Sequence, residues 1–362
     1  MKTEDLLKAL HLPLTASSVT ELEQLKTWCA NNVSRDLKFD GSIEQQYAKY
    51  AEIATIQRTF TELAVGDATT SNPTLGDMSA IQFAAMRGFD IYLEKLECTP
   101  TQINLVTSKG KNTPLHLAAS GGHLLAAEQL IRKGARLDVL DNQNNTPAMR
   151  CLMLSGTSSR EKRQQVFELL KDTSNLFVHH NSSGNTIFHL AAQFGFHQLL
   201  KNFITIRPEG LLEQNNDHLY PMQLAIRQVG NSKETVELFL TYPEAMSAVS
   251  TDTGEVALHD AARYIKEDAG LAEALVIASM HANVPLDIKN SHGQTPLALA
   301  SKAMNKNMIR ALLAHGIHLA PKDIVHAYQA NRNIAFCEWM AEQQPDLHHV
   351  IDDLRAYEPK LS

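Results

Sequence analysis

Most of the chain alternates short apolar stretches of helical periodicity with breaks made of glycine or of polar turn residues. The clearest example is 113–137, TPLHLAASGGHLLAAEQLIRKGARL, in which a glycine pair separates two apolar stretches. The hydroxyl of Thr113 can cap a helix, and Pro114 suits the first helical position because it has no donor to lose. Gly134 suits the left-handed residue that ends a helix. This pattern predicts a short helix, a turn and a second helix over 124–133.

The polar stretch RLDVLDNQNN follows the second helix and ends in turn-forming residues. It predicts an extended, hairpin-like connection, which we call a finger. A unit of two helices and one finger cannot bury both of its faces alone. Stacked copies bury each other's faces, so this unit predicts a solenoid of repeats.

The same order of residue types returns along the chain, and a second strong copy is 295–319, TPLALASKAMNKNMIRALLAHGIHL. Weaker copies begin at Ser79, Thr146, Thr186, Tyr220 and Val256, so the start-to-start spacings are 34, 33, 40, 34, 36 and 39 residues. The two longest repeats contain the charged segments 157–164 and 264–270, which we expect to lengthen helices or turns and to face solvent. A period of this length is typical of a repeat architecture.

These repeats resemble ankyrin repeats, whose signature is a TPLHxA helix start at a period of about 33 residues. The resemblance covers residues 76–342 and is most specific in the two strong copies. It implies an all-α fold, an ankyrin-repeat solenoid of about seven helix-turn-helix repeats. It also implies that His116, His189 and His259 hydrogen-bond loop backbone between neighbouring repeats.

The two ends of the chain do not fit the repeat. Residues 1–75 predict three helices, which we expect to form an N-terminal bundle that caps the first repeat, since an uncapped solenoid would expose its apolar end. Near the other end, 321–329 and 333–342 predict the two helices of a divergent capping repeat, with Phe336 and Trp339 closing the apolar end. The predicted domains are the bundle 1–75, the repeat array 76–342 and the tail 343–362.

Charge and composition narrow the functional classes. With 33 Lys and Arg against 40 Asp and Glu, the formal charge is −7, which gives no global attraction to nucleic acid. The start of the chain lacks the apolar core of a signal peptide, and no stretch approaches about 18 uninterrupted apolar residues. The four cysteines lie too far apart for a CxxC pair. These features predict a soluble, cytoplasmic protein with reduced thiols, no membrane insertion and no nucleic-acid partner.

No motif of a catalytic or cofactor site is found. The sequence has no GxSxG, no GxxxxGK[ST] and no GxGxxG. The adjacent His259 and Asp260 occupy the repeat motif and have no second such pair, which disfavours a metal-dependent phosphohydrolase. We therefore predict no catalytic residue, no metal and no cofactor. The alternative is an adaptor or enzyme whose activity resides in 1–75.

The ankyrin resemblance implies a concave groove, lined by finger tips and by exposed positions at the end of the first helix of each repeat. On this sequence the groove positions are Met86, Arg87, Met153, Gln193, Phe194, Arg227, Gln228, Arg263, Tyr264 and Lys302. The finger tips are expected at 142–145, 180–183, 215–218, 251–253 and 290–292. The groove positions combine apolar or aromatic residues with four cations and no acid. Aromatic and arginine side chains favour protein interfaces, so we predict a partner protein with an acidic, partly apolar segment.

The predicted function is a non-catalytic scaffold that binds another protein through this groove. Irregular repeats behind an unrelated helical segment also resemble the ankyrin effectors that intracellular bacterial pathogens inject into host cells. That resemblance implies a host protein as the partner and host cytosol as the place of action. It also implies a secretion signal in the C-terminal tail, IDDLRAYEPKLS.

Overall fold

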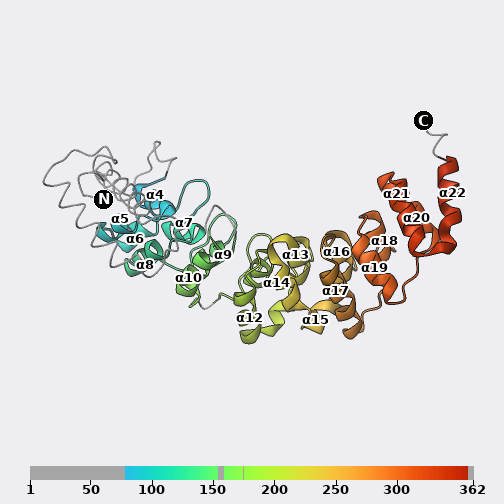
Figure 1. Cartoon of the computed structure of the whole chain (residues 1–362). Helices are drawn as coiled ribbons and strands as arrows, with labels where there is room; N and C mark the ends of the chain where they lie inside the picture. Colours follow the sequence, from blue (N-terminus) through green and yellow to red (C-terminus); the bar gives the residue numbers. More distant parts are fainter. Residues whose placement is uncertain (1–77, 154–158, 174, 358–362) are drawn as a thin grey trace, which may run out of the picture. The chain divides into compact units, whose positions relative to one another are not determined.

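The computed structural model of the chain describes residues 78–153, 159–173 and 175–357 (Figure 1). The predicted bundle 1–75 therefore lies outside the described residues. Contacts divide the chain into two compact units, which we describe separately: the first is Met1–Ala118 with His123–Arg136, and the second is Ala119–Gly122 with Leu137–Ser362. No helix of the described residues has both the length and the hydrophobicity needed to cross a bilayer.

Paired helices follow one another along the described chain. The first helices of the pairs are α4 (Ala80–Arg87), α7 (Pro114–Gly121), α9 (Pro147–Leu152), α11 (Ile187–Gln193), α13 (Pro221–Arg227), α16 (Ala257–Tyr264) and α18 (Pro296–Lys302). The second helices are α5 (Asp90–Lys95), α8 (Leu124–Arg132), α10 (Arg160–Leu170), α12 (His197–Ile206), α14 (Val229–Phe239), α17 (Ala269–His281) and α19 (Lys306–Ala314). Short helices α6 (Pro100–Ile103), η2 (Pro208–Leu212) and α15 (Pro243–Ser247) follow three of the pairs. The described residues thus contain the seven predicted repeats.

The helix starts are capped as the sequence predicts. The hydroxyls of Thr146 and Thr295 each accept a hydrogen bond from the backbone three residues later, both at 3.2 Å. At another helix start His116 completes the cap, since its Nδ1 accepts from Thr113 N at 3.2 Å. Two further histidines do the same: His189 Nδ1 accepts from Thr186 N, and His259 Nδ1 accepts from Val256 N, both at 3.2 Å. These local bonds satisfy amide groups that a helix start leaves without partners.

The same two histidines also bridge neighbouring repeats, as predicted. His189 Nε2 donates to the carbonyl oxygen of Leu219 at 3.1 Å, and His259 Nε2 donates to that of Gln294 at 3.3 Å. Both imidazoles are fully buried. Each ring therefore ties a helix start to the finger of the following repeat, which is a structural role.

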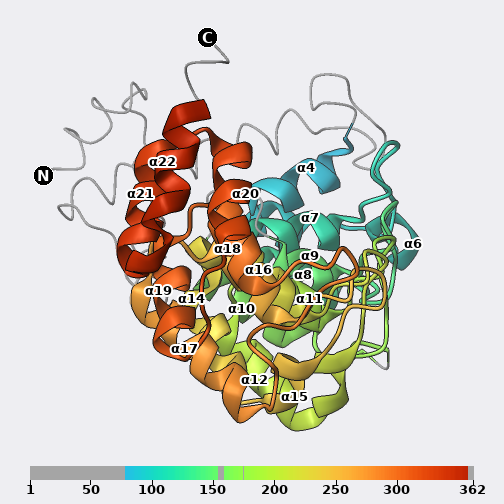
Figure 2. The same ribbon diagram turned by 90° about the vertical axis from the view of Figure 1, so that its right-hand side faces the viewer.

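In the second unit, the helices form two layers. Contacts run from α11 to α13, α16, α18 and then α20 (Pro321–Asn331) in one layer, and from α12 to α14 and from α15 to α17 and α19 in the other. In the end-on view of Figure 2, α17 and α19 lie to one side of α16 and α18, with the fingers on the opposite side. The alanine pairs of the repeat motif are fully buried, as at Ala191, Ala192, Ala261 and Ala262. Such small side chains let consecutive first helices approach closely.

The fingers end in turns at the predicted positions and are joined by asparagine side chains. Within one finger, Asn181 Oδ1 accepts from the backbone of Ser183 and Asn185, both at 3.0 Å. Between fingers, Asn181 Nδ2 donates to Asn145 Oδ1 at 2.9 Å, and Asn215 Nδ2 donates to Asn185 Oδ1 at 2.8 Å. The same side chain thus shapes its own turn and fixes its distance from the preceding finger.

The two long repeats accommodate their extra residues differently. In one, Lys266 and Glu267 are exposed in the turn between α16 and α17, as predicted. In the other, α10 begins inside the charged segment, and Arg163 is fully buried, with Nη1 donating to the carbonyl oxygen of Met153 at 2.6 Å. The expectation that this whole segment faces solvent was wrong, because Arg163 lies on the inner face of α10 and caps the preceding turn.

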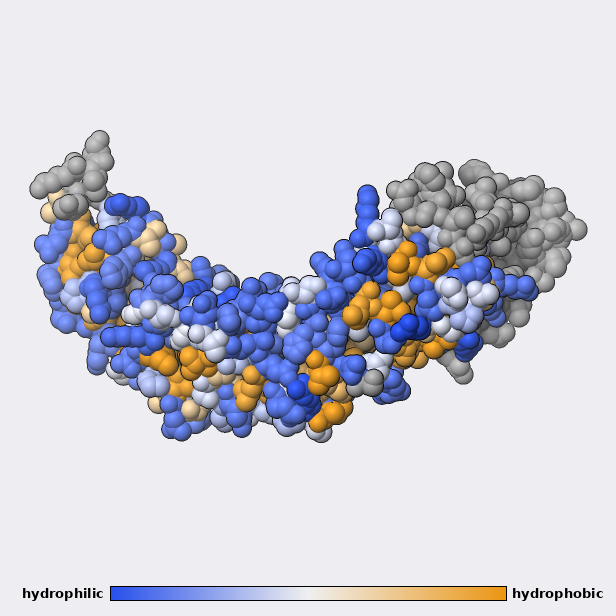
Figure 3. Space-filling model, turned by 180° about the vertical axis from the view of Figure 1, so that it is seen from behind, coloured by the Kyte–Doolittle hydropathy of each residue, from blue (hydrophilic) through white to orange (hydrophobic). Residues whose placement is uncertain are grey.

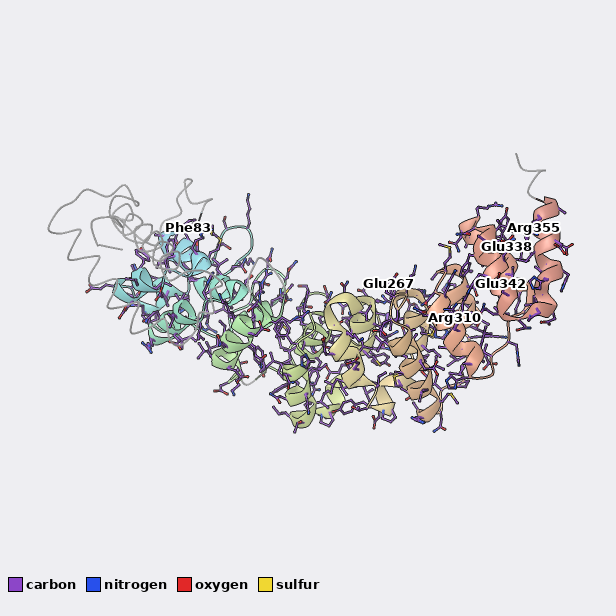
Figure 4. All side chains as sticks on the ribbon, in the orientation of Figure 1. Phe83, Glu267, Arg310, Glu338, Glu342 and Arg355 are labelled. Carbon is purple, nitrogen blue, oxygen red and sulfur yellow. The ribbon has the colours of Figure 1, made fainter. Side chains whose placement is uncertain are left out.

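The C-terminal end confirms the two predicted helices but corrects how they close the array. Helices α20 (Pro321–Asn331) and α21 (Ile334–Gln343) are followed by η3 (Pro345–Leu347) and α22 (His348–Tyr357). Trp339 does not close the end, since it packs back on α19 beneath Lys306 and Arg310, which lie 4.9 and 5.2 Å from the ring centroid. Helix α22 covers α20 and α21 instead. Figure 4 shows Arg355 of α22 beside Glu338 of α21, with which it forms an ion pair.

Apolar side chains reach the surface in separate places. On the face drawn in Figure 3, hydrophobic residues form small clusters among hydrophilic ones. The most exposed large apolar side chains of the described residues are Ile206 at 66% and Val178 at 52%. Isolated exposed apolar residues are ordinary in soluble domains, so only those that border a pocket call for an explanation.

Candidate functional site

The ten predicted groove residues all lie at the ends of first helices. Met86 and Arg87 end α4, Met153 follows α9, Gln193 and Phe194 end α11, Arg227 and Gln228 end α13, Arg263 and Tyr264 end α16, and Lys302 ends α18. None of these ten is buried. The first two belong to the first unit and the others to the second. The repeat register therefore places them at equivalent, accessible positions.

Three of these residues come together between α13 and α16. Arg227 Nε donates to Asp260 Oδ1 at 2.8 Å, and the Arg227 guanidinium carbon lies 5.9 Å from the centroid of the Tyr264 ring. Arg263 Nη1 lies 3.9 Å from the same Asp260 oxygen. The other Asp260 oxygen accepts from Gln223 Nε2 at 2.8 Å. A fully buried carboxylate thus holds the cations of two consecutive repeats in place.

A second buried carboxylate extends this network into the next repeat. Arg263 Nη1 donates to Glu255 Oε2 at 2.7 Å, and a second Nη bond to Oε1 makes the pair bidentate. Asn290 Nδ2, in the following finger, donates to Glu255 Oε1 at 2.9 Å. Bidentate arginine–carboxylate pairs fix geometry as well as charge. The Arg227–Asp260 and Arg263–Glu255 pairs, together with Asn290, therefore link α13, α16 and the finger that precedes α18.

This network corrects the predicted charge of the surface. The groove positions predict cations without an acid, but two of the four cations, Arg227 and Arg263, are paired with buried carboxylates. The signal was present in the sequence: Asp260 occupies the repeat position that leucine holds at 117, 190, 224 and 299. A charged residue in an apolar position needs an opposite charge close by. The repeat pattern could not say which cation supplies it.

The environments of the two carboxylates shift their pKa values in opposite directions. Burial raises the pKa of Asp260, although the bonds from Arg227 and Gln223 oppose it. For Glu255, burial also favours the protonated form, but hydrogen bonds from Arg263 and Asn290 outweigh it and lower the pKa. Two differences explain this: Asp260 is the more deeply buried of the two, and it receives only one bond from Arg227, whereas Glu255 receives two from one guanidinium.

Part of the cluster remains available to a partner. The structure gives the two Nη groups of Arg227 no hydrogen-bond partner among the described residues, and 30% of this side chain is exposed. Tyr264 is 43% exposed beside it. Lys302, at the equivalent position two helices further along the layer from α13, has no ion pair among the described residues. A partner's carboxylate could therefore accept hydrogen bonds from the Nη groups of Arg227, whose side chain Asp260 already orients.

The described part of the chain shows no grouping of side chains suited to a metal ion. No three His, Cys, Asp or Glu side chains there gather as metal ligands would. Cys151 and Cys337 are buried, and burial raises the pKa of both thiols, that of Cys337 to about 11. A thiol with a raised pKa is a poor nucleophile at neutral pH.

Comparison with protein families and curated proteins identifies the repeats. The family model described as "Ankyrin repeat" matches residues 110–142, and the model described as "Ankyrin repeats (3 copies)" matches residues 222–323. A transient receptor potential cation channel subfamily A member 1 homolog of Caenorhabditis elegans is 27% identical over 213 residues, which are 59% of this chain and 16% of that protein. A poly [ADP-ribose] polymerase tankyrase of the same organism is 31% identical over 150 residues, 41% of this chain and 6% of that protein. The chain thus spans only a small part of either relative.

Solved structures with similar folds carry ankyrin repeats as well. The human ASB11 ankyrin repeat domain gives a TM-score of 0.48 at 21% identity, and the match covers 67% of this chain and 100% of that domain. The ankyrin repeat domain of Bcl-3 gives a TM-score of 0.44 at 23% identity, covering 57% of this chain and 87% of that one.

Proposed function

Because residues 110–142 and 222–323 are ankyrin repeats in an all-helical ankyrin-repeat solenoid, we propose that this chain is a non-catalytic scaffold that binds another protein. The binding surface consists of the ends of α11, α13, α16 and α18 in the second unit. The observation that carries the proposal is the pair of Arg227 and Tyr264, which are accessible on neighbouring repeats, with Arg227 held in place by the buried Asp260.

The chemistry of this pair suits a protein anchor. Arginine and tyrosine are enriched among the residues that contribute most to protein interfaces. Asp260 holds Arg227 before any partner arrives, so binding costs less side-chain entropy than it would for a free arginine. Phe194, which is half-buried in the preceding repeat, offers a further apolar contact.

The proposed partner presents an acidic and partly apolar segment. Its carboxylate would meet the Nη groups of Arg227, and a second acid would meet Lys302. Arg263 contributes little, since Glu255 already satisfies its two Nη groups. The electrostatic attraction of an acidic partner is therefore weaker than it would be if all four cations were unpaired. The apolar contacts of Tyr264 and Phe194 contribute correspondingly more of the affinity.

A capture experiment with matched variants tests this surface. Tyr264→Ala should abolish recovery of the partner from a eukaryotic cell lysate, because Tyr264 supplies the central aromatic contact. Met280→Ala on α17 removes an apolar side chain of similar exposure, 45% against 43%, and should leave recovery unchanged. Recovered proteins are compared by mass spectrometry, and both variants should unfold at the wild-type temperature. Equal recovery by the two variants would contradict the proposal.

Secretion into a host cell is a separate and finer proposal, supported by the acids of the tail. Asp352 and Asp353 are exposed on α22, while Glu358 lies outside the described residues. Deleting the last 15 or so residues should abolish translocation of a reporter fusion from a bacterium that carries the secretion system. Translocation of the truncated fusion at the full-length level would remove the support. The alternative of an adaptor or enzyme activity in 1–75 also falls outside the described residues.

A further inference from the structure

A pocket of about 480 Å³ opens on the layer of second helices, away from the proposed partner surface. It lies between the C-terminal part of α10, the residues that follow α10, and α12. Its apolar wall consists of Phe167, Leu176, Phe177, Leu199, Phe203 and Ile206. Its rim carries Glu168, Lys171, Asp172, Asn202 and Thr205. Apolar walls with a few polar groups are typical of binding sites, and this volume lies within their usual range.

The wall of the pocket is held in place by contacts between aromatic rings. The centroid of Phe203 lies 5.5 Å from that of Phe167, 5.6 Å from that of Phe177 and 5.8 Å from that of Phe188. Gly210 leaves room for Phe188, since a Cβ there would lie 2.3 Å from a ring carbon. The aromatic wall is thus packed from behind, and the pocket does not need to form on binding.

The wide mouth of the pocket and the charges on its rim indicate what kind of group it binds. Ile206 stands at the mouth with 66% of its surface exposed, so an occupant gains apolar contact both inside and at the edge. A small free molecule would leave much of its surface in water here, whereas a side chain attached to an outlying backbone would not. On the rim, Lys171 is bound to Glu168 at 2.8 Å, so the exposed Asp172 gives the rim a net negative charge.

We propose that this pocket is a second protein-binding site, which takes one large apolar side chain flanked by a lysine or arginine of a partner. The apolar side chain fills the space over Phe167 and Phe203, and the neighbouring cation meets Asp172. The site is distinct from the surface at Arg227 and Tyr264, which favours an acidic segment. The two helix layers therefore bind segments of opposite charge.

Selection of peptides from a random display library against the full chain tests this site. Peptides that bind the pocket should share a Leu, Phe or Trp next to Lys or Arg. Asn202→Trp fills the mouth and should weaken their binding at least tenfold, whereas Gln198→Trp, on the same helix outside the pocket lining, should leave it unchanged. Tyr264→Ala should also leave it unchanged, so a failure of the groove proposal does not affect this test.

Two further variants keep the test decisive if Asn202→Trp perturbs folding. Ile206→Ala removes an exposed side chain at the mouth and should also weaken binding several-fold. Asp172→Lys should weaken it in the same way, while Asp287→Lys, an exposed acid in a distant finger, should not. The proposal is overturned if no selected peptide responds to these pocket variants or if the shared sequence is acidic. Free indole competing as strongly as the peptides would also overturn it, by assigning the pocket to a small molecule.

Discussion

Replacing Arg227 with alanine is expected to lower the free energy of unfolding by about 3 kcal/mol. The reason is that Asp260 is fully buried and loses the cation that compensates its charge. Removing one partner of a buried pair costs more than the pair contributes, because an uncompensated charge stays behind. Urea unfolding followed by circular dichroism measures the change. Because the stability of a repeat array depends on the contacts between neighbouring repeats, the contact between α13 and α16 should be the one that is weakened most.

Two variants separate this effect from a general effect of losing a cation. Lys302→Ala removes a cation from the equivalent position of another repeat, where no carboxylate depends on it, and should change stability by less than about 0.5 kcal/mol. Adding Asp260→Leu to Arg227→Ala should recover most of the loss, because other repeats hold leucine at this position. Wild-type stability of Arg227→Ala alone would show that the pair does not hold the two repeats together.

Acidification from pH 7 to about 4.5 is expected to lower the free energy of unfolding by about 2.4 kcal/mol through His189 alone. Burial lowers the pKa of this imidazole to about 4, and the bond that Nε2 donates to Leu219 only partly opposes the shift. In the unfolded chain the pKa is about 6.5. The unfolded state therefore binds the proton first, so this stability is present above pH 6.5 and is lost as pH falls towards 4.

Substitution of His189 isolates its share of the pH dependence. His189→Gln is less stable at pH 7, since it loses a cap and a bridge between repeats, but its unfolding free energy should fall less between pH 7 and 4.5. His326→Gln, an exposed position on α20, should keep the wild-type slope. Burial lowers the pKa of His259 too, so some slope remains in His189→Gln. Parallel curves for the wild type and His189→Gln would contradict the assignment.

The repeat, its helix starts and its turns could be predicted from the sequence, because they depend on residues that are neighbours along the chain. Thr146 and Thr295 cap the helices that they precede, and the asparagine at the head of a finger bonds amides two and four residues later. Such bonds span a few residues and depend on side-chain chemistry and spacing alone. The bridging role of the motif histidines was implied only by the ankyrin resemblance, and the structure shows it for His189 and His259.

Only the tertiary structure decided which side chains meet across repeats and around the inserted residues. Asp260 lies 33 residues beyond Arg227, and the pairing depends on how α16 is turned against α13. Likewise, Trp339 faces α19 rather than the open end, and Arg163 turns inward from a charged segment. The pocket between α10 and α12 is built by residues that no single repeat contains. A repeat pattern specifies the environment of each position within one repeat. Contacts between repeats depend instead on small rotations of one repeat against the next and on inserted residues, and neither produces a periodic pattern in the sequence.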